Sequence, residues 1–179
     1  MATTTSWVES LSAFARQQAH GHAAQAAIQA EDWKPMSLTP QQNELVITLT
    51  ELIIPETDTP GAKAARVNRF IDSVLHDAPA ANRTGFVRGL AWVDERSRTL
   101  YKRNFVAASV AEQTSLLSKM ADVRNKAAAD RTGIEFFRAI KSMTIDGYYT
   151  SEIGLMQELG DSPQMFLAEF PGCDHPEHQ

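Results

Sequence analysis

Apolar residues recur at helical spacing along most of this chain, and this periodicity limits the fold more strongly than any other feature of the sequence. In the clearest stretch they occupy positions i, i+3, i+4, i+7 and i+8, at Val67, Phe70, Ile71, Val74 and Leu75. Such a stripe covers one side of a helix and has to be buried against other elements. Clear strand alternation flanked by hairpin turns is found nowhere in the sequence. The sequence therefore predicts an all-α fold.

Start and stop signals divide the chain into about six helices. Four starts are capping boxes, in which a Ser or Thr and a Glu or Gln three residues later bond each other's backbone N–H groups. These boxes begin at Ser6, Thr39, Ser109 and Thr132. Pro55 and Pro79 are expected to end the helices before them, because proline removes a backbone donor and clashes with the preceding turn. The expected result is a single bundle-like helical domain.

The same periodicity predicts which side of each later helix is buried. A long helix from about Arg83 turns inward Phe86, Leu90, Val93 and Leu100. The helix after Ser109 buries Leu116, Leu117, Met120 and Val123. The helix after Thr132 buries Phe136, Phe137, Ile140 and Met143. After Gly147 the periodicity ends, and only a short helical turn is expected before the tail.

The chain is long enough for one domain, and its ends differ from its middle. We assign residues 1–35 to an N-terminal helical arm and linker, residues 36–160 to the helical core, and residues 161–179 to an extended C-terminal tail. The first helix is expected to continue to near Ala30, but its apolar stripe thins after Ala15, so it has to pack on another surface. The apolar tail also needs a surface, either of its own domain or of a partner.

Charge and motif content exclude several functional classes. The chain carries 17 Lys and Arg against 22 Asp and Glu, a net charge of -5, and has no basic face for nucleic acid. No apolar stretch is long enough to span a membrane. The chain has neither a glycine-rich nucleotide loop nor a CxxC motif, so no FAD, NAD, ATP, haem c or iron–sulfur cluster is expected in it. The N-terminal residues lack a signal-peptide hydrophobic region, which leaves the cytoplasm, a removed signal, or export with a partner.

Histidine and cysteine residues form two weak candidates for a metal site. His20 and His22 lie two positions apart, so on a helix their side chains diverge and are expected to face solvent. Cys173, His175 and His178 are three potential ligands in the tail, without a fourth ligand or a rigid frame. No metal is therefore expected. A disulfide to another chain, burial against a partner, and a plain free thiol stay open for Cys173.

Two groups of side chains suggest acid–base chemistry on paper. Asp146, Tyr148 and Tyr149 combine a carboxylate with two phenols that can donate a proton. The same residues match a helix end followed by aromatic packing, which we favour. Glu56 and Asp58 would need opposed environments to act as an acid and a base, and their place in a turn favours capping roles. No catalytic residue is therefore predicted.

A continuous stretch of the sequence carries a family resemblance. It is ELIIPETDTPGAKAARVNRFID, from Glu51 to Asp72, in which a helix, a proline-containing loop and a second helix follow each other. The later segments GLAWVDERSRTLYKRNF and GIEFFRAIKSMTIDGYYTSEIG, and the ending EFPGCDHPEH, agree with it. Together they resemble the gluconate 2-dehydrogenase subunit 3 family. The likeness covers nearly everything after Trp33.

The resemblance implies a small subunit that holds no cofactor and supports the folding, stability or export of a large flavoprotein. That partner is of the glucose–methanol–choline (GMC) type, holds FAD and oxidises a sugar or sugar acid. Many such complexes add a multi-haem cytochrome c. Export in many members uses a twin-arginine signal on the small subunit, which this sequence lacks, so a periplasmic complex is expected with the cytoplasm as the alternative. A stand-alone helical enzyme and a small-ligand binding domain are the alternative functions.

Residues at the interface with this partner are expected among aromatic, loop and tail side chains. The candidates are Trp7, Asp58, Trp92, Tyr148, Tyr149, Phe166, Phe170 and Cys173. Trp92 lies off the stripe set by Leu90 and Val93, which suits a partner interface or, equally, a second packing surface within the domain. An obligate partner would bury on the order of 2,000 Å² or more.

Overall fold

Helices make up the regular structure of the part of the chain that can be described. The computed structural model describes residues 6–18 and 33–160. They form α1 (Trp7–Gln18), α3 (Pro40–Ile53), α4 (Val67–Asp77), α5 (Ala80–Tyr101), α6 (Val110–Ala121) and α7 (Arg131–Tyr149). A 3-10 turn, η1 (Ala128–Asp130), leads into α7, and a π-helix, η2 (Ile153–Glu158), follows it. These residues contain no strand, and the all-α prediction is confirmed.

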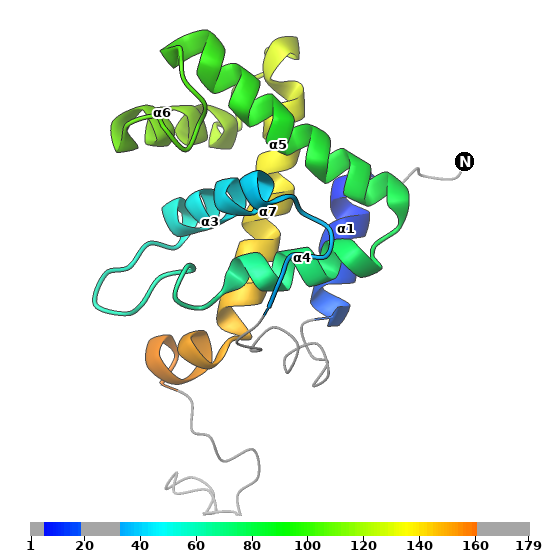
Figure 1. Cartoon of the computed structure of the whole chain (residues 1–179), viewed down its shortest axis with the longest axis vertical. Coiled ribbons are helices and arrows are strands. Elements are labelled where there is room, and N and C mark those ends of the chain that lie inside the picture. The colour runs from blue at the N-terminus through cyan, green and yellow to red at the C-terminus, as the bar shows by residue number, and fades with distance from the viewer. Residues whose placement is uncertain (1–5, 19–32, 161–179) are drawn as a thin grey trace, which may run out of the picture.

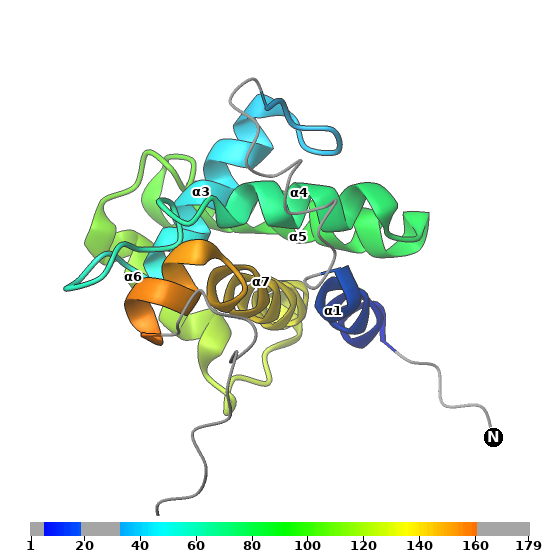
Figure 2. The same ribbon diagram turned by 90° about the horizontal axis from the view of Figure 1, so that it is seen from below.

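Helix α7 lies at the centre of the arrangement. It contacts α1, α3, α4, α5 and α6. In Figure 1 it runs along the long axis of the molecule, and in Figure 2 it is seen end-on beside α1, with α4 and α5 lying across both. Its buried side chains include Phe136, Ile140, Met143 and Tyr148. The core of the domain is therefore built around one helix that reaches from end to end.

Helix α1 packs on this bundle rather than projecting from it. Leu11 and Ala15 of α1 are fully buried, and α1 contacts α7, α5 and α4. The surface that its thin apolar stripe requires is therefore supplied by the chain itself. The predicted continuation of this helix to Ala30 lies outside the described residues.

Three of the four predicted capping boxes are present. Ser6, Thr39 and Ser109 each accept from the backbone N–H three residues later, and the Glu or Gln at that position returns the bond. The predicted helix ends also hold, since α3 ends before Pro55 and α4 ends before Pro79. Local sequence therefore fixes these helix boundaries.

The capping box predicted at Thr132 is wrong. Helix α7 begins at Arg131, directly after η1, and no side chain caps it. Asp130, at the junction, forms ion pairs with Arg96 of α5 and Lys119 of α6. These long-range contacts hold Asp130 at the N-cap position, two residues before Thr132.

Two apolar side chains that were predicted to be buried are exposed. Leu100 follows Val93 and Ser97 at helical spacing, but it lies in the last turn of α5 and is 44% exposed. Val123 is 74% exposed, because α6 ends at Ala121 and the chain turns away before Val123 is reached. Both predictions followed the apolar character of a residue past the point where its helix still faced the core.

The ends of α5 and α7 also differ from the prediction. Helix α5 begins at Ala80, three residues before Arg83, since Ala80 and Ala81 are strong helix formers and complete its first turn. Helix α7 continues through Gly147, where the ring of Phe70 packs against the glycine. The single turn that was expected after it is the π-helix η2.

A buried carboxylate fixes the segment that leads into α3. Asp72 of α4 is fully buried, and its oxygens accept from the backbone N–H groups of Met36, Ser37 and Leu38, at 2.7 to 3.0 Å. Several hydrogen bonds from N–H groups compensate the loss of water around a carboxylate. The start of α3 is thereby held against α4, which positions the loop that follows α3.

Candidate interaction surface

The loop at residues 54–66 connects α3 to α4, and a side chain of α3 holds its two sides together. The carboxylate of Glu51, in the last turn of α3, accepts from the backbone N–H groups of Glu56 and Lys63, at 3.0 and 2.8 Å. At Gly61 a Cβ atom would lie 2.5 Å from Oε1 of Glu51, so this close approach requires a glycine. Glu51 therefore fixes the two sides of the loop relative to each other.

The end of α7 and helix η2 hold the same loop from another side. The hydroxyl of Tyr148, a residue that is 1% exposed, donates to the carbonyl oxygen of Pro60 at 2.8 Å. The hydroxyl of Thr59 donates to a carboxylate oxygen of Glu158 in η2. Both bonds join residues far apart in the sequence. The loop, the end of α7 and η2 therefore form one continuous surface, at the bottom of Figure 1.

A tight turn places η2 against the end of α7. The hydroxyl of Ser151 donates to the carbonyl oxygen of Tyr148 at 2.6 Å and accepts from the backbone N–H of Gly154 at 3.1 Å. Ser151 and Gly154 are buried in this turn, whereas Leu155 and Met156 of η2 are exposed. The turn therefore presents apolar side chains on a backbone that is itself hydrogen-bonded.

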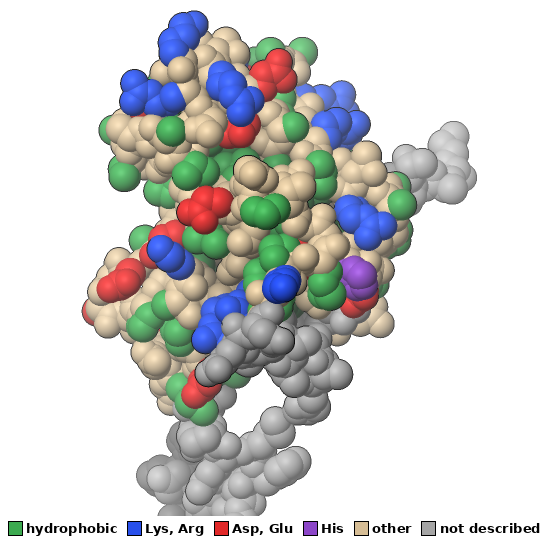
Figure 3. All heavy atoms as spheres, in the orientation of Figure 1, with side chains coloured by type: hydrophobic (Ala, Val, Ile, Leu, Met, Phe, Trp, Pro, Cys, Tyr) green, Lys and Arg blue, Asp and Glu red, His purple; other side chains and the backbone are tan. Residues whose placement is uncertain are grey.

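We call this surface the acidic–apolar end, and it comprises residues 51–66 and 142–160. Its large exposed apolar side chains, each 36% to 59% exposed, are Ile145, Tyr149, Leu155, Met156 and Leu159. The two ranges carry six Asp and Glu against two Lys and Arg. Figure 3 shows acidic and hydrophobic side chains close together over this lower part of the molecule. Exposed apolar side chains that gather in this way mark contact surfaces.

The opposite end of the molecule has the opposite charge. Residues 94–141, which we call the basic end, carry ten Lys and Arg against six Asp and Glu. In Figure 3, Lys and Arg side chains gather at the top, over the end of α5 and its neighbours. Exposed apolar residues also occur here, at Leu100, Val106, Val110 and Val123. The chain is therefore polarised along α7.

A buried cluster organises the basic end. Asp130 is 1% exposed, and its oxygens lie 3.1 Å from Nη2 of Arg96 and 3.2 Å from Nζ of Lys119. They also accept from Nδ2 of Asn125 at 3.0 Å. Burial alone would raise the pKa of Asp130, but the Asn125 hydrogen bond and the two cations outweigh it and hold the pKa below its ordinary value. The basic end is thus locked by an ionised carboxylate.

The two tryptophan candidates take part in the packing of the domain. Trp7 of α1 is partly buried and packs against Gly85 of α5. The indole N–H of Trp92 donates to the carbonyl oxygen of Ala129 at 3.2 Å, and its ring packs against Gly133 of α7. The second packing surface, which was one of two interpretations of Trp92, is what these contacts show.

Asp58, Tyr148 and Tyr149 all belong to the acidic–apolar end. Asp58 is exposed on the loop, and a hydrogen bond from the hydroxyl of Thr57, at 2.9 Å, lowers the pKa of its carboxyl. The rings of Tyr148 and Tyr149 meet edge to face, with centroids 5.2 Å apart. Tyr148 is buried and supports the loop, whereas Tyr149 is 36% exposed and available to a partner.

Two of the candidate acid–base groups, Asp146 and Tyr148, are engaged in the packing of the domain. Burial raises the pKa of Asp146, against the opposing effects of Arg16 in α1 and of a hydrogen bond with Ser142. The hydroxyl of Tyr148 is taken up by the loop. The interpretation of these residues as a helix end with aromatic packing agrees with this placement.

Several predicted residues lie outside the part of the chain that the structure describes. They are His20, His22, Phe166, Phe170, Cys173, His175 and His178. Among the described residues, no three His, Cys, Asp or Glu side chains lie close enough to hold a metal ion. None of the described helices has the length and hydrophobicity to cross a membrane.

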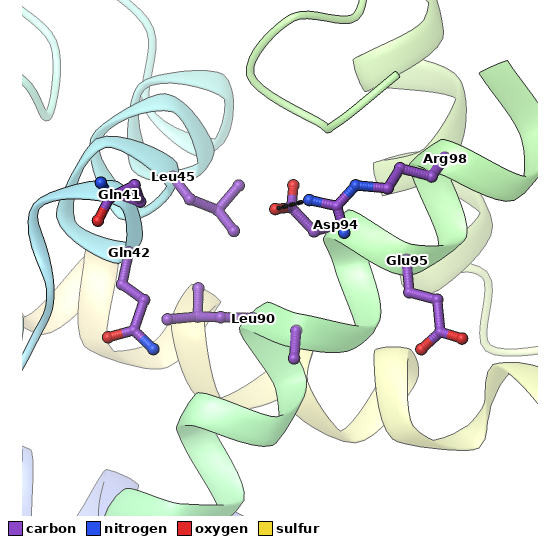
Figure 4. Close-up of a pocket in the computed structure, with 8 residues that line it drawn as sticks. Gln41, Gln42, Leu45, Leu90, Asp94, Glu95 and Arg98 are labelled. Carbon is purple, nitrogen blue, oxygen red and sulfur yellow. Dashed lines mark hydrogen bonds and ion pairs between the residues drawn. The ribbon is translucent and has the colours of Figure 1, made fainter. Parts of the chain in front are cut away.

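An open hollow of about 410 Å³ lies between α3 and α5. Figure 4 shows Gln41 and Gln42 on one side of it and Asp94, Glu95 and Arg98 on the other, with Arg98 pointing to Asp94. Several of its polar groups already stabilise the fold. Gln42 completes a capping box, and Asp94 accepts from the side chain of Arg98 and from the backbone N–H of Phe105. The hollow is therefore a poorer candidate for a site than the acidic–apolar end.

Comparison with known families identifies the relationship of this chain. The family model for gluconate 2-dehydrogenase subunit 3 matches residues 40–166. The chain belongs to the gluconate 2-dehydrogenase subunit 3 family. Searches of curated proteins and of solved structures gave no match. The matched range runs from the first residue of α3 past η2, and it includes the whole acidic–apolar end. Membership in the family makes the chain a subunit of a dehydrogenase complex.

Sequence reasoning missed the residues that hold the two ends in place. Glu51 carried a usable signal, because an acidic residue in the last turn of a helix opposes the helix dipole and so needs another reason to be there. Asp130 had no comparable signal, since its partners Arg96 and Lys119 come from two other helices.

Proposed function

We propose that this member of the subunit 3 family is a non-catalytic small subunit that stabilises an FAD-dependent sugar or sugar-acid dehydrogenase and assists its folding or export. The catalytic partner is a large GMC-type flavoprotein, which holds the FAD. Many complexes of this family add a cytochrome c subunit whose haem c accepts the electrons, and the proposal allows for such a third subunit. The complex works in the periplasm, and the cytoplasm is the alternative location.

The observation that carries this proposal is the acidic–apolar end. Five large apolar side chains are exposed there on a surface whose backbone is held by Glu51, Tyr148 and Ser151. Apolar side chains on a preformed surface favour association, because little conformational entropy is lost when a partner binds. A subunit whose role is to support a larger chain requires such a surface.

Co-expression with a GMC-type flavoprotein tests the proposal. We expect one complex in size-exclusion chromatography, with the absorbance of bound flavin, and a sharp fall in soluble flavin-loaded protein when the small chain is omitted. A spectrum of the complex also shows whether haem is present. A flavoprotein that is equally soluble, flavin-loaded and active without the small chain contradicts the proposal, as does oxidation of a sugar by the small chain alone.

The C-terminal segment extends the proposed contact. Phe166 and Phe170 supply further apolar side chains, and Cys173 either bridges to the flavoprotein or is buried against it. Electrophoresis of the purified complex without a reducing agent tests the bridge. Migration of the two chains as separate bands in that experiment excludes a disulfide, and the accessibility of Cys173 to a thiol reagent in the complex then tests burial.

A further inference from the structure

We propose that the acidic–apolar end is the docking surface for the flavoprotein, and that the face bound there has Lys and Arg side chains around an apolar centre. This inference rests on the proposed function and adds to it the place and the chemistry of the contact. Three properties of the described residues support it: exposed apolar side chains, charge, and a preformed shape.

The apolar centre of the docking surface lies on η2 and on the last turns of α7. Leu155, Met156 and Leu159 are 37%, 42% and 59% exposed, and Tyr149 is 36% exposed. Removing such side chains from water supplies a driving force of roughly 25 cal/mol per Å² of apolar area. Tyrosine and methionine are also enriched at the cores of interfaces. This group is the anchor of the contact.

Exposed carboxylates lie in the loop and at the start of η2, beside that centre, and outnumber the one exposed cation of the loop, Lys63. Glu56 and Asp58 are exposed on the loop, and Glu152 is exposed at the start of η2. From Ser142 to Gly160 the described chain has no Lys or Arg. Charged groups at the rim of an interface select a partner of opposite sign and speed its association. The rim therefore specifies a basic face.

The charge of the other end reinforces this choice. Ten Lys and Arg stand against six Asp and Glu in residues 94–141, so a basic partner is repelled there and attracted at the acidic–apolar end. Apolar residues are also exposed at the basic end, such as Val110 and Val123, but the excess of Lys and Arg there disfavours a basic partner. The separation of charge along α7 thus orients the encounter as well as strengthening it.

The docking surface is already in shape. Glu51 closes the loop, Tyr148 ties it to α7, and the bond from Thr59 to Glu158 ties it to η2. The loop with its acidic residues and the helix with its apolar residues therefore meet a partner as one rigid unit. Binding to a preformed surface avoids the cost of ordering the loop.

Matched pairs of variants test the inference in the full-length chain co-expressed with the flavoprotein. Glu152→Lys and Leu159→Asp change the acidic–apolar end, whereas Glu95→Lys and Leu100→Asp make the same changes at exposed positions of the basic end. Binding is measured as a dissociation constant and an association rate at low and high salt. Thermal unfolding of each isolated variant serves as the control for folding.

We expect the two variants of the acidic–apolar end to weaken binding about tenfold or more, since each places a like charge or an unpaired charge in the contact. The two variants of the basic end should bind as the wild type does. Added salt should slow association of the wild type and remove much of the penalty of Glu152→Lys. The inference is overturned, while the proposed function stands, if Glu152→Lys and Leu159→Asp bind the flavoprotein as tightly as the wild type does. The same holds if only the basic-end variants lose affinity. Absence of any wild-type complex overturns both.

Discussion

The two ends of α7 are held in opposite ways. At the basic end a buried carboxylate, Asp130, binds two cations and an amide, so the lock depends on an ionised group. At the acidic–apolar end the phenol of Tyr148 binds a carbonyl oxygen, and the carboxylate of Glu51 binds backbone N–H groups. One end is closed by ion pairs between a buried carboxylate and two cations. The other end is closed by side chains that bond to backbone groups, and by the bond from Thr59 to Glu158.

This difference explains which charges are left for a partner. The basic end uses Arg96 and Lys119 internally to hold Asp130, and its other cations remain outside. The acidic–apolar end holds its loop through backbone groups, so exposed carboxylates such as Asp58 and Glu152 are not needed to keep the fold together. A surface that keeps its shape without its rim charges can use those charges for recognition.

The largest expected effect on stability comes from removing the buried carboxylate of Asp130 at the basic end. We expect Asp130→Ala to lower the free energy of unfolding by about 2–4 kcal/mol, because Arg96 and Lys119 then lose a buried partner. The loss should fall below that of a fully buried triad, since the side chains of Arg96 and Lys119 are 24% and 44% exposed. Urea unfolding measures the change, with Glu135→Ala, which breaks an exposed pair, as the control at below about 1 kcal/mol.

The ion pairs of Asp130 also predict how the free energy of unfolding depends on pH. Because the folded-state pKa of Asp130 lies below the ordinary value of 3.8, its stabilisation is fully present above that value and is lost as pH falls through the lowered pKa. The difference between wild type and Asp130→Ala should therefore shrink in strong acid. A difference that stays constant down to full protonation would show that shape, rather than charge, closes the basic end.

The next effect concerns the loop of the acidic–apolar end. We expect Glu51→Ala to lower the free energy of unfolding by about 1–2 kcal/mol, because the N–H groups of Glu56 and Lys63 lose their acceptor. Glu51→Gln, which keeps one acceptor oxygen, should cost less. Hydrogen exchange of these two amides should speed up, while Glu44→Ala, an exposed site on the same helix, should leave them unchanged. Unchanged exchange in Glu51→Ala would mean that the loop is held from outside α3.

A smaller effect is expected at the second support of that loop. Tyr148→Phe removes one hydroxyl and leaves the carbonyl oxygen of Pro60 without its donor, which should cost about 1 kcal/mol of unfolding free energy. Tyr149→Phe, beside it, should have no measurable effect on stability. Equal losses in both variants would assign the effect to the pair of rings instead of the bond to the loop.

The sequence predicted what depends on neighbours in the chain. The boxes at Thr39 and Ser109 and the end of α4 before Pro79 need only residues within one turn, and they were predicted correctly. The start of α7 was wrong, because a cluster from three segments outweighs the local signal of Thr132.

The surface itself could be predicted only in part. Asp58 and the two tyrosines were singled out because their types suit a turn and an interface. That the loop and η2 meet, through the bond from Thr59 to Glu158, depends on how α3, α4 and α7 pack. No spacing along the chain encodes a contact between residues so far apart, so the surface emerges only from the fold.

The smallest expected effect is a gain in the free energy of unfolding, opposite in sign to the effect of Asp130→Ala. Burial raises the pKa of Asp146, so its charge costs stability at neutral pH, even with Arg16 nearby. We expect Asp146→Asn to raise the free energy of unfolding by less than about 1 kcal/mol at neutral pH. Because the folded-state pKa is raised, the cost is fully present above it and disappears as pH falls through it, so the advantage of the variant should vanish in acid. Glu152→Gln, at an exposed site, is the control and should change nothing. A less stable Asp146→Asn at neutral pH would mean that attraction to Arg16 dominates, and that α1 is attached by charge in the same way as the basic end is closed.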